Sequence, residues 1–540
     1  MSAGSPRNQS GSLIRNAGII GAATLLSRLL GFVRDMVTAS YLGTSIYADA
    51  FFVAFRIPNL LRRLFGEGSL TAAFIPVFAT YLAAGKRQEA REIAQTAMTL
   101  TALCLTVVTL LGILFSPVII SLIAPGFADT PEKYEIAVFL NRLMFPYILL
   151  ISLVALAMGI LNADGHFLTP ALAPVLLNLC MIGAALGLSR VLGNPALALA
   201  VGVLAGGLAQ LLMQLPVLKK HGFPWRLRFH FRHPAIKRVI VLMGPSLLGL
   251  AITQITIFVN TLLASYLADG SISFLYFADR LIQFPLGIFA VALGTAVLPA
   301  LSRAAAGLDW HDFSDTLSLA LRLLMFITLP AMAGLIMLSK PIVFLLFQRG
   351  HFGAHSTDMV SQTIIAYACG LWAYAGLRII VPAFHSLQDT KTPVKVGAIA
   401  LISNLICAVG LMPYLQHLGL ALATAIASAV NCLLLLAMLK KRLGPDIQLR
   451  GCGRAFGQSL LATTTMVIII MSLDRLPLIT TTYHSHLEES LRLAIRIIFG
   501  LAAYFLCARL LHSPELSELQ SLLTRRRRKA ATKPPQNPGL

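Results

Sequence analysis

The sequence predicts an all-α polytopic membrane protein with about fourteen transmembrane helices. Of its 540 residues, 57% are hydrophobic and 12% are charged, whereas charged residues make up about 25% of an ordinary soluble domain. Apolar runs of about 20 residues, the length that crosses the hydrocarbon core of a bilayer, recur along the chain. A faint internal repeat further predicts two pseudo-symmetric six-helix lobes around a central cavity, followed by two C-terminal helices.

The apolar runs place the spans in order along the chain. The second and eighth spans are the most charged, and the second is long enough to contain a break. The predicted spans cover residues 14–34, 46–84, 93–123, 136–161, 168–189, 195–218, 238–263, 272–302, 313–346, 359–385, 394–414, 418–439, 455–473 and 491–511.

The loops between the spans alternate in charge. Basic loops include Lys86–Arg91 and Lys219–Arg238, whereas the loops 124–135 and 264–271 are neutral or acidic. Because basic loops remain on the cytoplasmic side of a membrane, we expect both termini to be cytoplasmic. The net charge of +21 then reflects membrane topology, and we expect no nucleic-acid partner. The basic C-terminal tail is predicted to be disordered and to contact membrane lipids.

Landmark residues recur at a constant offset along the chain. Phe51 matches Phe274 and Pro76 matches Pro299, each 223 positions apart. An even number of spans separates the two copies, which predicts parallel repeats related by an axis along the membrane normal. This arrangement is typical of transporters, although a static scaffold can also arise by duplication. The predicted domains are an N-terminal extension (1–13), an N-lobe (14–218), a basic linker (219–237), a C-lobe (238–440), the last two spans (441–512) and the disordered tail (513–540).

The first span carries charges where the membrane is apolar. Arg28 precedes Arg34 by six residues, which places it about 9 Å deeper along a helix. An arginine at the centre of a membrane helix costs about 2.5–3.5 kcal/mol. The adjacent Arg34 and Asp35 lie near the predicted end of the span, where their charged groups can reach the membrane surface. Arg28 is therefore the stronger indication of a function.

The second and eighth spans carry further charges, and they occupy matching places in the two repeats. Their charges therefore predict one shared cavity. Arginines outnumber acids there, which favours an anionic substrate, because the planar guanidinium can bind phosphate through two hydrogen bonds. The alternative is that the arginines of span two lie near the inner membrane surface and only reach towards water. Span two contains Asp49, Arg56, Arg62, Arg63 and Glu67, and span eight contains Asp279, Arg280 and Gln283.

Motifs for several kinds of chemistry are missing. The sequence contains no GxxxxGK[ST] loop for ATP, no HExxH zinc motif and no GxSxG nucleophile motif. The seven cysteines are scattered and lack the spacing of metal ligands. We therefore predict a transporter rather than an enzyme, with no catalytic residues, no metal and no cofactor. A membrane potential or an ion gradient is the remaining source of energy.

Several long stretches have specific sequences, which include SRLLGFVRD, DAFFVAFRIPNLLRRLFGEGSLTAAFIPVF, PALAPVLLN, FADRLIQFPLGIFAVALGTAVLPALS and QDTKTPVKV. They resemble the MurJ/MviN family of lipid II flippases, which belongs to the multidrug, oligosaccharidyl-lipid and polysaccharide exporter superfamily. The resemblance covers about residues 14–511. It implies alternating access without ATP, by which lipid II (an undecaprenyl diphosphate bearing a disaccharide-pentapeptide) moves from the inner to the outer leaflet of the bacterial inner membrane for peptidoglycan synthesis.

The resemblance also implies roles for individual residues. It makes lipid II the substrate, places its prenyl tail in a groove of the last two spans, and suggests other cell-wall synthesis proteins as partners. Gln283 departs from relatives that carry Glu at this position. The implied substrate-binding residues are Arg28, Arg34, Asn59, Arg62 and Arg280, and the implied gating or charge partners are Asp35, Asp49, Glu67 and Asp279.

Three other functions stay open at this point. A flippase for another undecaprenyl-diphosphate glycan would use the same phosphate chemistry. A drug or cation antiporter of the same superfamily would need a cavity rich in acids and aromatic residues. A membrane scaffold would not require Arg28 or Arg280.

Overall fold

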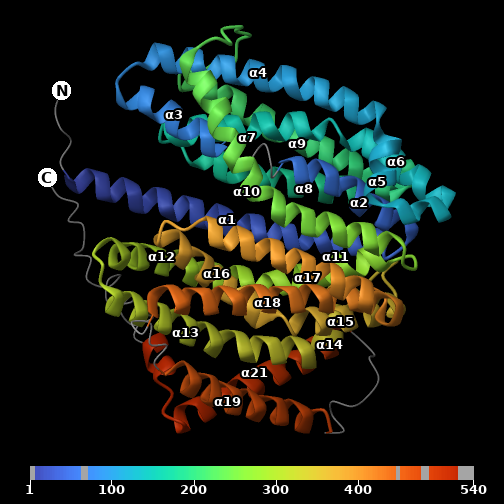
Figure 1. Ribbon diagram of the computed structural model, residues 1–540. Coiled ribbons are helices and arrows are strands. Elements are labelled where there is room, and N and C mark those ends of the chain that lie inside the picture. Colours follow the sequence, from blue (N-terminus) through green and yellow to red (C-terminus); the bar gives the residue numbers. More distant parts are fainter. Residues whose placement is uncertain (1–5, 63–70, 445–450, 476–485, 521–540) are drawn as a thin grey trace, which may run out of the picture. The chain divides into compact units, whose positions relative to one another are not determined.

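The computed structural model describes residues 6–62, 71–444, 451–475 and 486–520, and every regular element in these ranges is a helix (Figure 1). The chain divides into two compact units. Unit 1 comprises residues 1–276 and 347–356, and unit 2 comprises residues 277–346 and 357–540. Unit 1 includes the predicted seventh span, which the sequence repeat assigns to the second lobe. The repeat itself stays a prediction.

The helices α1 to α10 belong to unit 1, and α11 begins in unit 1 and continues into unit 2. The elements up to this point are α1 (Pro6–Leu42), α2 (Ile46–Leu61), α3 (Thr71–Ala83), α4 (Arg87–Leu114), α5 (Ser116–Ile123), the 3₁₀ helix η2 (Pro125–Asp129), α6 (Pro131–Met144), α7 (Tyr147–Ala163), α8 (Leu168–Leu192), α9 (Pro195–Lys220), α10 (Pro234–Ser265) and α11 (Ser271–Pro285).

The remaining helices belong mainly to unit 2, and one of them departs from α geometry. It is η3, a π-helical segment directly after Pro285. The elements are η3 (Leu286–Ala290), α12 (Val291–Ala306), α13 (Trp310–Met337), α14 (Ser339–Phe347), α15 (Ala354–Ala368), α16 (Leu371–Ser386), α17 (Lys391–Leu415), α18 (His417–Leu443), α19 (Cys452–Leu473) and α21 (His486–Leu510).

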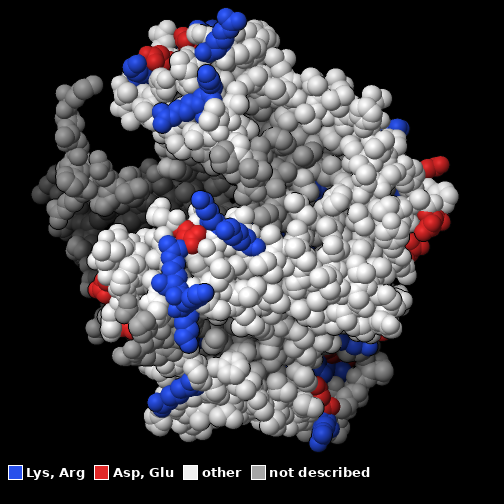
Figure 2. Space-filling model, viewed as in Figure 1, with Lys and Arg blue, Asp and Glu red and all other residues white. Residues whose placement is uncertain are grey.

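The helical membrane fold is confirmed. In the part of the chain that the structure describes, ten helices are long and apolar enough to cross a membrane, or eleven if the bent pair α15 and α16 forms one span. This number is compatible with the fourteen predicted spans, because α1 carries several charges and span two is divided between the short helices α2 and α3. On the face shown in Figure 2, most of the surface is neither basic nor acidic.

Several predicted spans are interrupted, and proline lies at or near the interruptions. The predicted span 136–161 lies within one apolar stretch long enough to cross a membrane, Pro131–Ala163, in which α6 and α7 are separated at Phe145 and Pro146. Residues 93–123 divide into α4 and α5, with Pro117 in the first turn of α5. Proline lacks the backbone N–H that an uninterrupted helix requires, and its ring obstructs the preceding turn.

The first helix ends later than the sequence suggested. The predicted span stops at residue 34, but α1 continues to Leu42, so Arg34 and Asp35 lie inside the helix. The pair therefore lies within the helix rather than at its end, and its contact with the membrane surface stays a prediction. Gly43, with a φ of +59°, terminates the helix in the left-handed conformation that glycine favours. A Cβ on Gly43 would also lie 2.4 Å from the carbonyl oxygen of His351.

The predicted disordered tail begins with an ordered segment. Residues 514–520 are helical, and Glu515 is buried. The Ser513 hydroxyl donates a hydrogen bond of 2.7 Å to Glu515 Oε2, and Arg322 Nη1 lies 3.6 Å from Glu515 Oε1. The start of the tail is therefore part of unit 2, and residues 521–540 lie outside the described residues.

Glycine allows α8 and α9 to pack closely within unit 1. A Cβ on Gly202 would lie 2.8 Å from the Cβ of Ala184 and 3.0 Å from the Cα of Met181. Gly187 on α8 differs, because a Cβ there would meet nothing within 4 Å. Small residues at such interfaces are a common means of close packing between membrane helices.

Replacing Gly202 by alanine should therefore destabilise the protein. We expect Gly202→Ala to lower the free energy of unfolding by about 1–3 kcal/mol, the usual penalty for overpacking. Gly187→Ala is the matched control and should be neutral or stabilising by about 0.5–1 kcal/mol, because alanine favours a helix over glycine. Thermal unfolding in detergent measures both, and equal melting temperatures for the two variants would contradict the prediction.

The QDTKTP stretch forms the turn that starts α17. Asp389 Oδ1 accepts hydrogen bonds from the backbone N–H groups of Lys391 (3.1 Å) and Thr392 (3.0 Å), and Oδ2 accepts one from the Thr392 hydroxyl (2.7 Å). Arg442 completes the site through an ion pair. The hydrogen bond from the Thr392 backbone lowers the pKa of Asp389 against the opposing effect of burial, and the Thr392 hydroxyl and Arg442 lower it further.

This lowered pKa makes the contribution of Asp389 depend on pH. The carboxylate stabilises the fold above its unfolded pKa of about 3.9, and the stabilisation is lost as the pH falls through the lower folded value. We expect Asp389→Ala to cost about 1 kcal/mol at pH 7, and the difference from the wild type to vanish in strong acid. Thermal unfolding across this pH range tests the idea, with the exposed Asp315→Ala as control. A difference that stays constant down to pH 3 would argue against it.

Candidate functional site

Arg34 and Asp35 form an ion pair inside unit 1. Arg34 Nη2 lies 2.8 Å from Asp35 Oδ1, and Arg34 Nη1 donates a hydrogen bond of 3.2 Å to Asn178 Oδ1 on α8. The Tyr276 hydroxyl donates to Asp35 Oδ1 at 3.3 Å, and the ring of Tyr276 stacks on Phe52 at a centroid distance of 3.9 Å. Asp35 is buried. These contacts hold the Arg34 guanidinium in a defined position.

Asn178 fastens α1 to α8, and the sequence analysis did not single it out. Its amide nitrogen donates a hydrogen bond of 3.1 Å to the carbonyl oxygen of Ser27, while its oxygen accepts from Arg34. The Asn178 side chain packs against Gly31, where a Cβ would make an ordinary van der Waals contact of 3.6 Å with Asn178 Nδ2. The available signal was an amide side chain in an otherwise apolar span, at the end of the PALAPVLLN stretch.

Arg28 differs from Arg34 in its surroundings. It is exposed, and it makes no hydrogen bond or ion pair with any residue that the structure describes. Six residues separate it from Arg34, which corresponds to about 120° around the helix. Leu25 and Leu29 nearby are 60% and 55% exposed, so exposed apolar side chains flank Arg28. Its guanidinium is available to an anion.

Asp49 is the most enclosed of the predicted charged residues. It is fully buried and accepts four hydrogen bonds. Lys133 Nζ donates at 2.8 Å, and the backbone N–H groups of Gly270 and Ser273 donate at 2.8 and 2.9 Å. The Ser273 hydroxyl donates at 2.6 Å. Both carboxylate oxygens are therefore occupied, and Asp49 joins α2 to α6 and to the start of α11.

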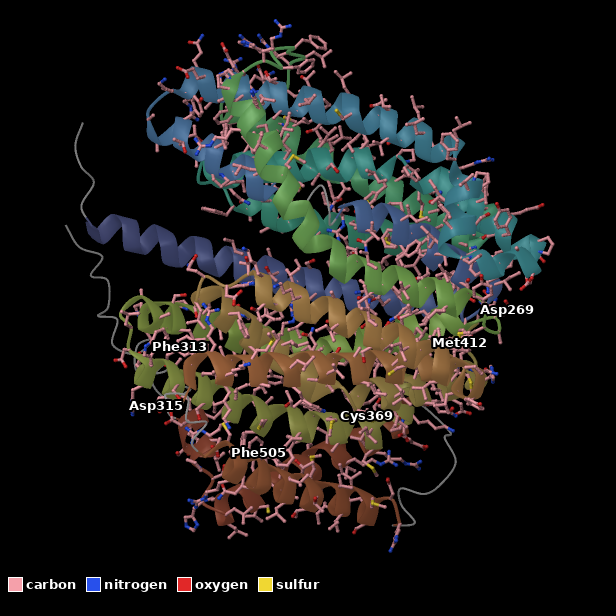
Figure 3. All side chains as sticks on the ribbon, viewed as in Figure 1. Asp269, Phe313, Asp315, Cys369, Met412 and Phe505 are labelled. Atoms are coloured by element: carbon pink, nitrogen blue, oxygen red, sulfur yellow. The ribbon has the colours of Figure 1, made fainter. Side chains whose placement is uncertain are left out.

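Lys133 is a second residue that the sequence analysis missed. It is 3% exposed, and its ammonium group lies between Asp49 and Asp269, at 2.8 and 2.9 Å. Figure 3 labels Asp269, in the loop between α10 and α11. The ammonium group also lies 4.5 Å from the ring centre of Phe127. Residues 124–135 were interpreted as a neutral or acidic loop, and their lone lysine was the available signal.

The end of α2 carries the next arginines. Arg62 donates from Nε and Nη2 to Asn59 Oδ1, at 3.0 and 2.9 Å. One turn and a half earlier, the Arg56 guanidinium donates to the hydroxyl of Thr261 on α10. Asn59 is a neutral acceptor, so it positions Arg62 without cancelling its charge. Arg63 and Glu67 lie outside the described residues.

Unit 2 contains the remaining predicted residues. Asp279 and Arg280 lie on α11 before Pro285, and both are partly exposed. Gln283 Nε2 donates a hydrogen bond of 3.3 Å to Asp279 Oδ1, so the glutamine here acts as a neutral partner of an acid. The structure thus brings Arg34 to Asp35 and Arg62 to Asn59. A cavity shared with Arg280 stays a prediction.

A comparison with protein-family models identifies the chain. The model described as "Lipid II flippase MurJ" matches residues 38–498. The chain belongs to the lipid II flippase MurJ family. A relative from Vibrio cholerae serotype O1, named "Probable lipid II flippase MurJ", is 40% identical over 430 residues, which cover 78% of this chain and 82% of the relative.

Solved structures agree with this family membership. A structure described as "Lipid II flippase MurJ, inward closed conformation" superimposes with a TM-score of 0.76 and 28% identity, covering 91% of this chain and 98% of that chain. An inward-facing multidrug resistance MATE family transporter of the MOP superfamily gives a TM-score of 0.63 at 16% identity, covering 79% and 98%. The second likeness shows the fold alone.

Removing the lysine of the buried network should lower the stability of the protein more than removing its exposed acid. Lys133→Met would leave Asp49 buried without its counter-charge, which costs about 3–5 kcal/mol. Asp269→Asn is the control, because the Asp269 side chain is 56% exposed and exposed pairs contribute about 0–1 kcal/mol. Both variants would be compared by thermal unfolding in detergent. Similar losses in the two variants would refute a dominant role for the buried pair.

Proposed function

We propose that the protein moves lipid II from the inner to the outer leaflet of the bacterial cytoplasmic membrane. Membership of the lipid II flippase MurJ family supports this function and assigns the chain to transporters, for which no catalytic residues are needed. The structural observation that supports the substrate chemistry is Arg28, an exposed guanidinium on the same helix as the anchored Arg34.

The diphosphate of lipid II suits these arginines. Arginine binds phosphate oxygens through charge-assisted hydrogen bonds, often in pairs. In this proposal Arg28 contacts the diphosphate directly. Arg34 and Arg62 contribute from fixed positions. The Asp35 carboxylate and the Asn178 amide hold Arg34, and the Asn59 amide holds Arg62. Arg280 adds a fourth guanidinium from α11.

Transport would proceed by alternating access without ATP, driven by a membrane potential or an ion gradient. The Arg34–Asp35 pair is the charge pair that would rearrange during the cycle. Its arginine side chain is 12% exposed, whereas both partners of the Asp49–Lys133 pair are 4% exposed or less. Opening the buried pair costs more, since it would leave the fully buried Asp49 carboxylate without the counter-charge of Lys133. We place both termini in the cytoplasm, following the basic loops.

The first test measures lipid II on the outer leaflet of cells depleted of this protein. Intact spheroplasts would be treated with an impermeant enzyme that cleaves lipid II, and the cleaved fraction counted. The wild type should restore cleavage. Arg28→Ala should reduce it about 10- to 100-fold, the loss expected for one charge-assisted contact of about 1.5–3 kcal/mol. Arg303→Ala, an exposed arginine at the end of α12, is the control at matched protein level.

Two results would overturn parts of this proposal. Lipid II that stays accessible after depletion, with no second flippase in the cells, would mean that the substrate is another undecaprenyl-diphosphate glycan or a different compound. Full activity of both Arg28→Ala and Arg280→Ala would show that these arginines do not bind the headgroup.

A further inference from the structure

Unit 1 contains a basic hollow that the proposed flipping function does not use. It has a volume of about 800 Å³ and lies between the first turns of α4 and the segment 222–228. Four arginines line this hollow, namely Arg87, Arg91, Arg226 and Arg228. We call the hollow the arginine pocket. Figure 2 shows basic side chains gathered over this end of α4.

The charges in the arginine pocket are only half compensated. Arg87 Nη1 lies 3.0 Å from Asp164 Oδ1, and Arg228 Nη2 lies 2.8 Å from Glu92 Oε1. Arg91 and Arg226 form no ion pair with the residues that the structure describes. Four guanidiniums against two carboxylates leave a surplus of two positive charges, which favours an anionic ligand.

The pocket is held in shape by contacts to α4. Arg87 Nη2 donates to the carbonyl oxygen of His221 at 2.8 Å, and its guanidinium lies 5.2 Å from the ring centre of Phe223, which is buried in the core of unit 1. Gln95 Nε2 donates to the carbonyl oxygen of Pro224 at 2.8 Å. Further along, the backbone N–H of Arg228 donates to the Thr99 hydroxyl at 3.1 Å. The arginines therefore project from a fixed frame.

The position of the pocket along the chain places it at a membrane surface. Two of the helices long and apolar enough to cross a membrane meet there, because α4 begins at Arg87 and α9 ends at Lys220. The chain then passes through the basic segment 221–233 before α10 begins. Basic loops of this kind lie on the side of the membrane where anionic lipid headgroups attract them, by about 1 kcal/mol for each Lys or Arg.

Apolar side chains alternate with the arginines of this segment. Leu227 and Phe229 are 68% and 64% exposed, and they separate Arg226, Arg228 and His230 in the sequence. Leu227 itself lines the arginine pocket together with Arg226 and Arg228. Exposed aromatic and apolar groups beside cations are characteristic of the membrane interface, whereas a soluble phosphate compound would give these groups nothing to contact.

We propose that the arginine pocket binds the phosphate of an anionic membrane phospholipid, while Leu227 and Phe229 enter the adjacent acyl region. Arg91 and Arg226 supply the uncompensated charge for the phosphate. Arg87 and Arg228 shape the pocket. The site is separate from the residues assigned to lipid II, so its test does not depend on the proposed flipping.

Trp225 offers a local probe, because it precedes Arg226 in the chain and the protein has three tryptophans. With Trp310→Phe and Trp372→Phe, the fluorescence of Trp225 can be read alone. The purified full-length protein, in uncharged detergent, would be titrated with brominated phosphatidylglycerol or brominated phosphatidylcholine. We expect phosphatidylglycerol to quench Trp225 at lower concentration. Arg91→Gln combined with Arg226→Gln should raise its half-quenching concentration about 10- to 30-fold.

The matched control removes the same charge outside the pocket, through Arg232→Gln combined with Lys237→Gln, and should raise the half-quenching concentration far less than the pocket variant does. Arg226→Gln alone, on an exposed segment, keeps the test valid if the double variant does not fold. Equal quenching by the two lipids, or an equal loss in the control, would overturn the proposal. Stabilisation of the protein against heat by millimolar inorganic phosphate, to the same extent as by phosphatidylglycerol, would assign the pocket to free phosphate instead.

Discussion

The buried carboxylate of Asp49 is the constraint on which much of unit 1 depends. A charge removed from water is tolerated only when opposite charge and hydrogen bonds replace the lost hydration. Here the opposite charge comes from α6 and hydrogen bonds come from the start of α11. Both segments must be in place for the Asp49 carboxylate to be stabilised. Because Lys133 also contacts Asp269 and Phe127, one carboxylate fixes the register of segments that are more than 200 residues apart in the chain.

The arginines of the candidate site follow a different rule. Asn178 and Asn59 accept hydrogen bonds from Arg34 and Arg62 through amide oxygens, and an amide orients a guanidinium without neutralising it. For Arg34 the amide acts beside the Asp35 carboxylate, which lies 2.8 Å from its guanidinium. The two amides therefore orient these guanidiniums without adding negative charge. Arg28 differs from both, because it pairs with no acid that the structure describes.

Hydrophobic patterning predicted the helices well, because every predicted span falls on one helix or on consecutive helices. It failed at helix ends and interruptions, which depend on single residues such as Gly43 and Pro146 and on what packs against them. The charged residues of α1 and α2 were recognised from their presence in apolar runs. Lys133 and Asn178 were missed because their importance lies in contacts over 84 and 144 residues of sequence, which local composition does not contain.

The π-helical segment Leu286–Ala290 changes the rotation about the helix axis between the side chains of α11 and those of α12. The backbone hydrogen bond of a π turn spans five residues, one more than that of an α turn. Each residue of an α-helix rotates the chain by about 100°. Side chains before the segment are therefore out of phase with those after it, relative to one uninterrupted helix. Residues of α12 at helical spacing from Asp279 and Arg280 therefore do not lie on the same face of the span as these two residues. The π segment thus rotates the side chains of α12 about the helix axis relative to those of α11. The two halves of this span can therefore face different neighbours.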